Sequence, residues 1–205
     1  DEYLASGSDS LFDSPEWHAL QTLDAGDYIG NVDLILTLTR NTLDTKKWLT
    51  TNGTVWDPTI RTVIGALWNR SAQTTNGSGA DFIQALSTQA EKNGAQIYLD
   101  TKAESLLQED GKVTGATITN ADGQTVTVNA KSVVMATGGF AANVDMRVEY
   151  NTEWADLGES IATNNHPGAT GDGIVMGEAV GADLVDMQWI QLMPLFPVSG
   201  GGISG

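Results

Sequence analysis

The stretch that decides the fold reads Val133-Val134-Met135-Ala136-Thr137-Gly138-Gly139-Phe140. Four apolar residues followed by a hydroxyl and two glycines are typical of a short buried strand that ends in a tight turn. Because apolar side chains occupy both faces, the pattern favours a parallel strand inside an α/β layer. The glycines let the backbone approach a ligand closely and leave N–H groups free for an anion. The alternative is a plain joint between strand and helix, since Gly-Gly pairs occur in many turns.

Upstream of this stretch the sequence predicts three helices. Their apolar residues repeat at helical spacing, and a Gly or an Asn-Gly pair ends each one. The predicted helices run from Asp13 to Gly26, from Asn31 to Asn52 and from Gly79 to Lys92. The stretch from Thr54 to Gly79 is mixed and polar, and we expect it to be irregular.

A change of apolar period from 3.6 to 2 after Gly94 predicts an antiparallel β meander. Hairpin turns are expected at 109–112 and 120–123, where glycines supply positive φ. The predicted strands are 96–99, 102–107, 113–119 and 125–128, with 133–136 as the buried strand described above. Helices are predicted at 143–150 and 174–180, with a polar loop from 151 to 170.

A second glycine-rich segment, Thr163 to Gly173, precedes the last helix. Asp172 could cap this helix. It could instead accept hydrogen bonds from ligand hydroxyls while the helix N-terminus faces a polar or anionic group. The segment contains more glycine than a cap needs, which favours the ligand interpretation. His166 lies in this segment too, but a histidine without a neighbouring carboxylate is a weak indicator of acid–base catalysis.

Composition excludes several classes of function. Lys and Arg number 10 against 26 Asp and Glu, a net charge of −16, which argues against a nucleic-acid partner. The absence of cysteine excludes disulfides, thiolate nucleophiles and iron–sulfur clusters held by this chain. No run of ~18 apolar residues exists, so no membrane span is predicted. No metal site is predicted either. A cysteine-free, acidic chain is compatible with a bacterial location outside the cytoplasm, which we favour.

The two ends of the chain predict that it is an internal piece of a longer protein. The first residues lack a starter Met, and the last residues are a glycine run without a cap. No Gly-x-Gly-x-x-Gly follows a strand, so the usual dinucleotide pyrophosphate loop is absent from these 205 residues.

Several motifs, taken in their order along the chain, resemble one protein family. They are Asp110-Gly111-Lys112-Val113-Thr114-Gly115, Ala136-Thr137-Gly138-Gly139-Phe140 and Asn165-His166-Pro167-Gly168-Ala169-Thr170-Gly171-Asp172-Gly173. The sequence resembles the FAD-binding domain of the fumarate reductase / succinate dehydrogenase flavoproteins. The resemblance is closest to the branch of soluble fumarate reductases, urocanate reductases and 3-ketosteroid dehydrogenases. It extends from about Ser78 to Gln191.

The resemblance implies an α/β fold in which 1–205 is an internal part of one FAD-binding domain. Residues 1–77 would be mainly helical. Residues 78–140 would hold a helix and the antiparallel meander. Residues 141–205 would hold glycine-rich loops and a helix that lead towards a capping domain. Together they would supply part of a Rossmann-like FAD-binding layer.

The same resemblance implies FAD as cofactor and assigns residues to it. The backbone of Ala103 would meet the adenine ring. The turn formed by Ala136, Thr137, Gly138 and Gly139 would pass the adenosine and pyrophosphate. The flavin and ribityl side would be lined by Asn164, Thr170, Gly171 and Asp172. The implied activity is reduction, or formation, of an activated C=C bond in an unsaturated acid or related small molecule, with a possible electron-donor protein or domain as partner.

Two departures from the family pattern affect this expectation. Fumarate reductases of the family carry a His two residues after the Gln of Ile190-Gln191, where this chain has Met193. Because Met cannot donate a hydrogen bond, we expect a substrate other than fumarate at Met193. The family's proton-donating Arg lies beyond this stretch, so the catalytic acid is unknown and the 205 residues alone are expected to be inactive.

Two alternatives to the enzyme stay open at this stage. The first is a non-catalytic relative that binds a small molecule on the same fold. The second is a free-standing binding or interaction domain unrelated to flavin.

Overall fold

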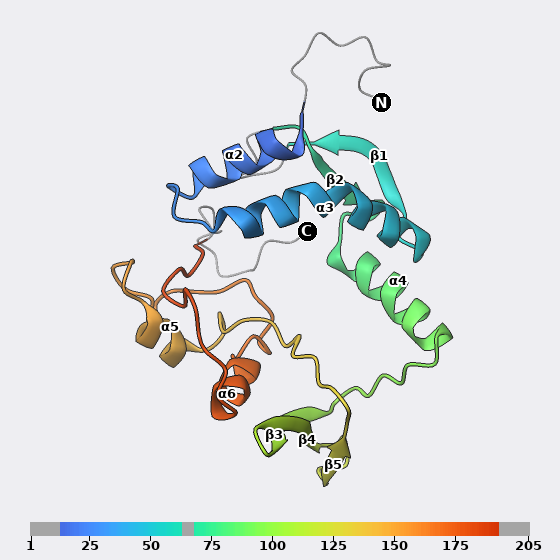
Figure 1. Ribbon diagram of the computed structural model, residues 1–205, viewed down its shortest axis with the longest axis vertical. Coiled ribbons are helices and arrows are strands. Elements are labelled where there is room, and N and C mark those ends of the chain that lie inside the picture. The colour runs from blue at the N-terminus through green and yellow to red at the C-terminus, as the bar shows by residue number, and fades with distance from the viewer. Residues whose placement is uncertain (1–12, 63–67, 193–205) are drawn as a thin grey trace. The chain divides into compact units, whose positions relative to one another are not determined.

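The computed structural model describes residues 13–62 and 68–192 (Figure 1). The chain divides into two compact units at Ile97 and Tyr98. The first unit contains a two-stranded sheet and the second a three-stranded sheet. The two glycine-rich segments both belong to the second unit.

In the first unit the helices α2 (Pro15–Ala25) and α3 (Val32–Thr51) pack against each other. Ser14 caps α2 and Asn31 caps α3, each by accepting a hydrogen bond from a backbone N–H group of the first turn. Both predicted helices are confirmed at their predicted starts, because capping side chains act on neighbouring residues and can be recognised locally.

A β hairpin follows where we expected irregular structure. Strand β1 (Trp56–Arg61) pairs antiparallel with β2 (Ser71–Thr74), with Arg61 opposite Ser71 and Trp56 opposite Thr74. The register shifts between Trp56 and Ile60, around Pro58, which has no N–H to donate. The prediction was wrong because Pro58 argues locally against a strand and β2 contains a single apolar residue, Ala72, so neither stretch stands out as a strand.

Helix α4 (Gly79–Lys92) is confirmed, with Ser78 as its N-cap and Asn93 as its C-cap. Its Phe82 ring meets the ring of Trp56 edge to face, at 5.7 Å between centroids. The Lys46 ammonium of α3 lies 5.3 Å from the centre of the Trp56 ring. Trp56 therefore links α3, β1 and α4.

The strand expected at residues 96–99 does not form. Residues 95–98 carry no regular secondary structure, and the chain bends at Leu99 and Asp100. Leu99 is 77% exposed. Local alternation of side chains cannot supply the neighbouring strand on which a β ladder depends.

The β meander of the second unit is confirmed. Its strands β3 (Lys102–Glu109), β4 (Lys112–Thr119) and β5 (Thr125–Asn129) pair antiparallel in that order. The first hairpin turns at Asp110 and Gly111, with φ of 48° and 76°, and the second turn contains Gly123 with φ of 76°. These left-handed residues are the turn signals that the sequence contained.

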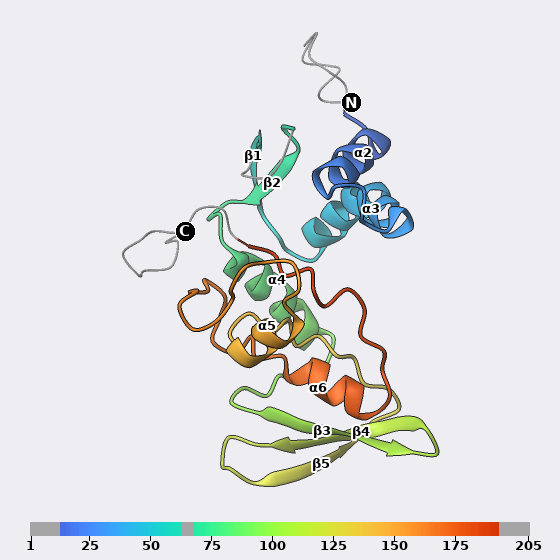
Figure 2. The same ribbon diagram turned by 90° about the vertical axis from the view of Figure 1, so that its left-hand side faces the viewer.

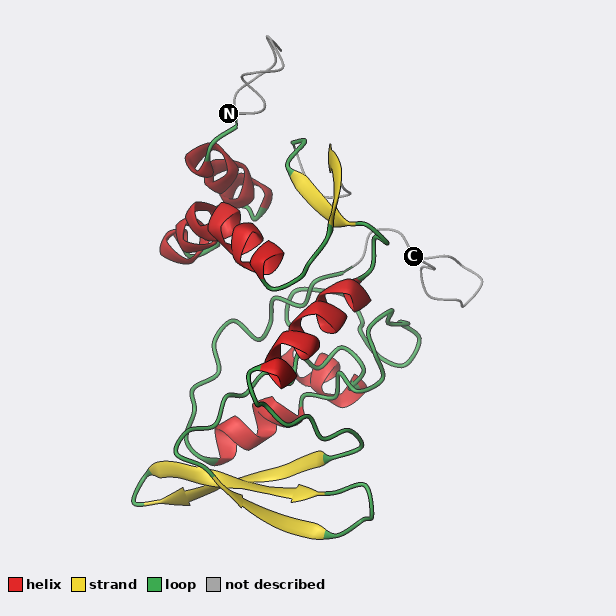
Figure 3. Ribbon diagram, turned by 90° about the vertical axis from the view of Figure 1, so that its right-hand side faces the viewer, coloured by secondary structure: helices red, strands yellow, loops and turns green. Residues whose placement is uncertain are grey.

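Two short helices complete the second unit, α5 (Val144–Tyr150) and α6 (Asp172–Ala179). Helix α6 lies against β3 of the meander (Figure 2). The side-chain amide of Gln108 in β3 donates a hydrogen bond to the carbonyl oxygen of Val180, at 3.0 Å. Long loops connect the remaining segments (Figure 3).

The segment predicted as a buried parallel strand, 133–136, is not a strand in this structure. It carries no regular secondary structure, and Val134 is 86% exposed. A parallel strand requires neighbours on its edges and cover on both faces. Among the described residues no strand pairs with this segment, and three of its four apolar residues are exposed, while Val133 is half-buried.

Candidate cofactor site

The structure brings together the two glycine-rich segments that the sequence singled out. The backbone N–H of Gly171 donates to the carbonyl oxygen of Gly139 at 3.1 Å, and the N–H of Ala142 donates to that of Ala169 at 2.9 Å. The side-chain amide of Asn143 donates to the carbonyl oxygen of Thr170 at 3.0 Å. These bonds join parts of the chain about thirty residues apart into one site.

Two of the glycines are required by close packing. Gly171 has φ of 81°, and a Cβ there would overlap Met146 Sδ and lie 3.0 Å from Phe140 Cβ. A Cβ on Gly173 would overlap Thr137 Oγ1. Both positions therefore exclude a side chain whether or not a ligand is bound. Close packing, and not only ligand binding, therefore explains why the segment from Thr163 to Gly173 contains so many glycines.

The other pair of glycines borders open space. A Cβ on Gly138 or on Gly139 would meet no atom of the described residues within 4 Å, and Gly138 has φ of 76°. Among the described residues, the N–H groups of Thr137, Gly138 and Gly139 have no hydrogen-bond acceptor. This arrangement fits a ligand that approaches the backbone closely and presents anionic oxygens. The turn therefore fits a nucleotide cofactor.

Asp172 is not the cap of helix α6. The N-cap is Gly171, which has no side-chain hydrogen bond to offer, and Asp172 is the first residue of the helix. The Thr170 hydroxyl donates to Asp172 Oδ1 at 2.8 Å, and no bond to Oδ2 is present among the described residues. The capping alternative for Asp172 is thus wrong, and its carboxylate can accept a hydrogen bond from a ligand hydroxyl.

The beginning of β3 belongs to the surroundings of this site. The hydrogen bond from Lys102 to Glu104, at 2.9 Å, raises the pKa of Lys102, and the negative charge of Asp172 raises it further. Helix α6, which begins at Asp172, packs against β3. The next residue, Ala103, is half-buried in β3.

The remaining predicted residues lie apart from these contacts. Ala136 is exposed before the first turn, and Asn164 is exposed in the second segment. Met193 lies outside the described residues. His166 accepts a hydrogen bond from the Gly168 N–H at its own Nδ1, at 3.0 Å, and so helps to shape the loop.

The contributions of helix α5 to the site could not be predicted from the sequence. Met146 is buried against Gly171, and Arg147 is buried with its guanidinium directed at loop carbonyls. Asn143 was predicted only as the start of a helix, yet its side chain also reaches Thr170. No local signal reports these contacts, because they depend on segments far apart in the sequence.

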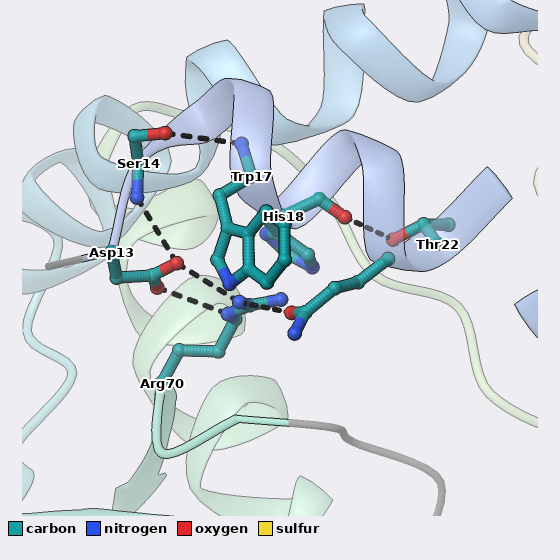
Figure 4. A network of polar contacts seen from close by, with 7 residues as sticks. Asp13, Ser14, Trp17, His18, Thr22 and Arg70 are labelled. Carbon is teal, nitrogen blue, oxygen red and sulfur yellow. Dashed lines mark hydrogen bonds and ion pairs between the residues drawn. The ribbon is translucent and has the colours of Figure 1, made fainter. Parts of the chain in front are cut away.

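A second polar cluster lies in the first unit, around Arg70 (Figure 4). The guanidinium forms a two-pronged ion pair with Asp13, with bonds of 3.0 and 2.9 Å, and also donates to Gln21. This side chain joins the residue before β2 to helix α2 and its N-terminus. The bonds of Arg70 to Asp13 and Gln21 therefore serve to connect these two segments.

His18, beside this cluster, leads to a prediction about pH. Burial, and secondly the Arg70 charge, lower the pKa of His18 below its ordinary 6.5. As the pH falls below about 6.5, the unfolded chain binds a proton that folded His18 binds only at lower pH. The free energy of unfolding should therefore fall with pH in this range. His18→Gln should reduce that slope in urea unfolding, and a His18 imidazole that titrates by NMR above 6.5 would contradict the prediction.

The fold and the site define the class of protein. A glycine turn with free N–H groups, joined to a helix N-terminus with an adjacent carboxylate, is typical of an α/β domain that binds a nucleotide cofactor.

Comparison with known proteins identifies the family. Residues 4–200 match the FAD binding domain family, and the chain belongs to it. FAD is therefore the cofactor of this domain, and the α/β fold class and the resemblance drawn from the sequence are confirmed.

The chain is 37% identical over 213 residues to an NADH:acrylate oxidoreductase of Vibrio harveyi, covering 98% of this chain and 21% of that protein. It is 38% identical over 200 residues to a urocanate reductase of Eggerthella lenta, covering 95% of this chain and 32% of that protein. The open conformation of a flavocytochrome c3 fumarate reductase superposes with a TM-score of 0.79 at 27% identity, covering 92% of this chain and 32% of that chain. The chain thus spans between a fifth and a third of these relatives.

The described residues contain neither a helix that could span a membrane nor a group of possible metal ligands. No helix among them is long and apolar enough to cross a membrane. In the same residues, no three Asp, Glu or His side chains gather in a way that could hold a metal ion.

Proposed function

We propose that the protein is an FAD-dependent oxidoreductase that reduces, or in reverse forms, the activated C=C bond of an unsaturated organic acid. The observation that carries the proposal is the hydrogen bond between Gly171 and Gly139, which places the open glycine turn beside Asp172. The similarity to proteins named as reductases of acrylate and urocanate supports this substrate class.

The glycine turn would bind the diphosphate of FAD. Within the described residues, the N–H groups of Gly138 and Gly139 are free to donate to its oxygens, and no side chain obstructs the approach. Ala136 and Thr137 would line the adenosine side of the same turn. Ala103, at the start of β3, would contact the adenine ring through its backbone.

The start of α6 would hold the ribityl chain and the flavin. A carboxylate repels phosphate, so Asp172 is suited to hydroxyl groups, whose hydrogen bonds it can accept. Thr170 already donates to Asp172 and fixes the orientation of that carboxylate. Asn164 and the backbone of Gly171 would complete this side of the site.

FAD, when bound, supplies the hydride that reduces the C=C bond. The residues of this chain bind the cofactor, orient it and exclude side chains from the space beside it. The electrons must come from a donor, and NADH, which appears in the name of the acrylate reductase, is the first to test.

Turnover of unsaturated acids tests the proposal. Protein expressed from its complete gene should oxidise a reduced viologen dye when acrylate, urocanate, fumarate or an aryl enoate is added. Turnover of at least one of these acids is the expected result. Protein that holds FAD but turns over none of them would contradict the proposal and favour a non-catalytic relative.

The identity of residue 193, a methionine, leads to a prediction about which unsaturated acids the enzyme prefers. A thioether offers no hydrogen bond to a substrate carboxylate, so fumarate should lose about 1–3 kcal/mol of binding at that end of the pocket. Met193→His should raise kcat/KM for fumarate relative to alkyl or aryl enoates. A native enzyme that already prefers fumarate would show that another residue supplies the donor.

A further inference from the structure

Arg147 in helix α5 is a buried cation that has no carboxylate partner among residues 13–62 and 68–192. Its side chain belongs to a residue that is only 6% exposed. The guanidinium donates to the carbonyl oxygen of Ile161 at 2.9 Å and to that of Gly158 at 3.4 Å, while its Nε has no partner in the part of the chain that the structure describes. The ion pairs among the described residues involve other cations. Burying an unpaired charge is costly, so this contact calls for a physical explanation.

Both acceptors of Arg147 belong to a single turn. The carbonyl oxygen of Gly158 also accepts a bond from the N–H of Ile161, at 3.1 Å. The N–H of Gly158 donates to Asp156 Oδ1 at 2.9 Å. The preceding residue, Leu157, is 3% exposed. The turn at 158–161 is therefore held by the buried Leu157 that precedes it, by its own hydrogen bonds and by the guanidinium.

The same helix holds the other end of the loop. Asn143 donates to the carbonyl oxygen of Thr170, and Met146 lies against Gly171. Helix α5 thus contacts the chain at 158–161 and again at 170–171. The stretch between these contacts, 162–169, contains Asn164 and has no regular secondary structure. Its two ends are fixed by one helix.

We propose that Arg147 is a positioning residue for the cofactor site. Its two charge-assisted hydrogen bonds fix the turn at 158–161 and thereby the start of the loop that carries Asn164 to the flavin side. The planar guanidinium suits two carbonyl oxygens at once, whereas the single ammonium of a lysine does not. The effect on FAD rests on the proposed function, but the effect on the order of the turn does not.

Two substitutions at Arg147 and one elsewhere test this role. Arg147→Met removes the charge and both bonds, and Arg147→Lys keeps the charge alone. Arg61→Met is the matched control, because Arg61 is an exposed arginine on β1. Hydrogen exchange of the amides at 157–163 is measured on the complete protein without and with FAD, together with the Kd for FAD.

Arg147→Met should speed exchange at 157–163 and weaken FAD binding, each by about tenfold to a hundredfold, because two hydrogen bonds from a charged group are lost. Exchange in β3 and β4 should stay as in the native protein. The exchange rates at 157–163 and the Kd for FAD of Arg147→Lys should lie between those of Arg147→Met and those of the native protein. Arg61→Met should change neither measurement.

The other possible results of these measurements also decide whether Arg147 is a positioning residue. Unchanged exchange at 157–163, or lowered stability with unchanged local exchange and unchanged FAD affinity, makes Arg147 a structural residue and overturns the proposal. If Arg147→Met does not fold, Arg147→Lys decides, and native-like exchange in it contradicts the proposal. If the native protein binds no FAD, the proposed function fails. The role of Arg147 is then tested only by hydrogen exchange at 157–163 measured without FAD.

Discussion

Replacing Gly171 by alanine should destabilise the protein by about 2–5 kcal/mol and abolish stoichiometric FAD. The left-handed φ of 81° costs an alanine about 1–2 kcal/mol. The new methyl group would also overlap Met146, and overpacking of this kind typically costs about 1–3 kcal/mol. Urea unfolding of the complete protein, with FAD content measured in parallel, gives both quantities.

Gly181→Ala is the matched control for this prediction. Gly181 has a similar φ of 92°, but a Cβ there meets no atom within 4 Å. It should therefore cost only the backbone strain, about 1–2 kcal/mol, and leave FAD bound. Adding Met146→Ala to Gly171→Ala should recover part of the loss, because the two residues are in contact. Equal costs at Gly171 and Gly181 would show that the contact with Met146 is unimportant.

Asp172→Ala should lower FAD affinity by about tenfold to a hundredfold or more. A hydrogen bond from a cofactor hydroxyl to a carboxylate contributes about 1.5–3 kcal/mol. Asp172→Asn should have a smaller effect, since it keeps an acceptor oxygen and loses only the charge. A fluorescence titration of flavin-free protein with FAD measures the Kd.

Asp183→Ala controls for the change in net charge. Asp183 is exposed after α6 and makes no hydrogen bond or ion pair with other described residues. Its removal should leave the Kd for FAD unchanged. If Asp172→Ala also leaves the Kd unchanged, the carboxylate only orders the loop through Thr170.

Most of the correct predictions about the fold rested on sequence patterns whose effects are local. Ser14 and Asn31 announce helices because each side chain bonds to backbone a few residues ahead. Asp110 and Gly111 announce a hairpin because their left-handed backbone is a property of the turn itself. Neither depends on the rest of the chain, so the sequence alone was sufficient.

Signals that depend on distant partners failed. Residues 133–136 have the composition of a buried strand, but a strand also needs a neighbour, and none of the described residues provides it. The hairpin of β1 and β2 was missed for the opposite reason, because its strands pair although Pro58 and the mostly polar sequence of β2 argue locally against strands.

The candidate site divides along the same line. The glycine motifs at 138–139 and 171–173 stand out in the sequence, and the structure places them together. The distinction between packing glycines and open glycines could not be predicted, because it depends on where Met146 and Thr137 lie. Arg147 could not be found either, since its partners are backbone carbonyl oxygens.

The most direct test of this account is the amount of FAD bound by protein expressed from its complete gene. The open turn at Gly138 and Gly139, joined to Asp172, predicts about one FAD released per chain on denaturation, or saturable binding of one FAD when flavin-free protein is titrated. Folded protein that contains no flavin and binds none on titration would contradict the central claim.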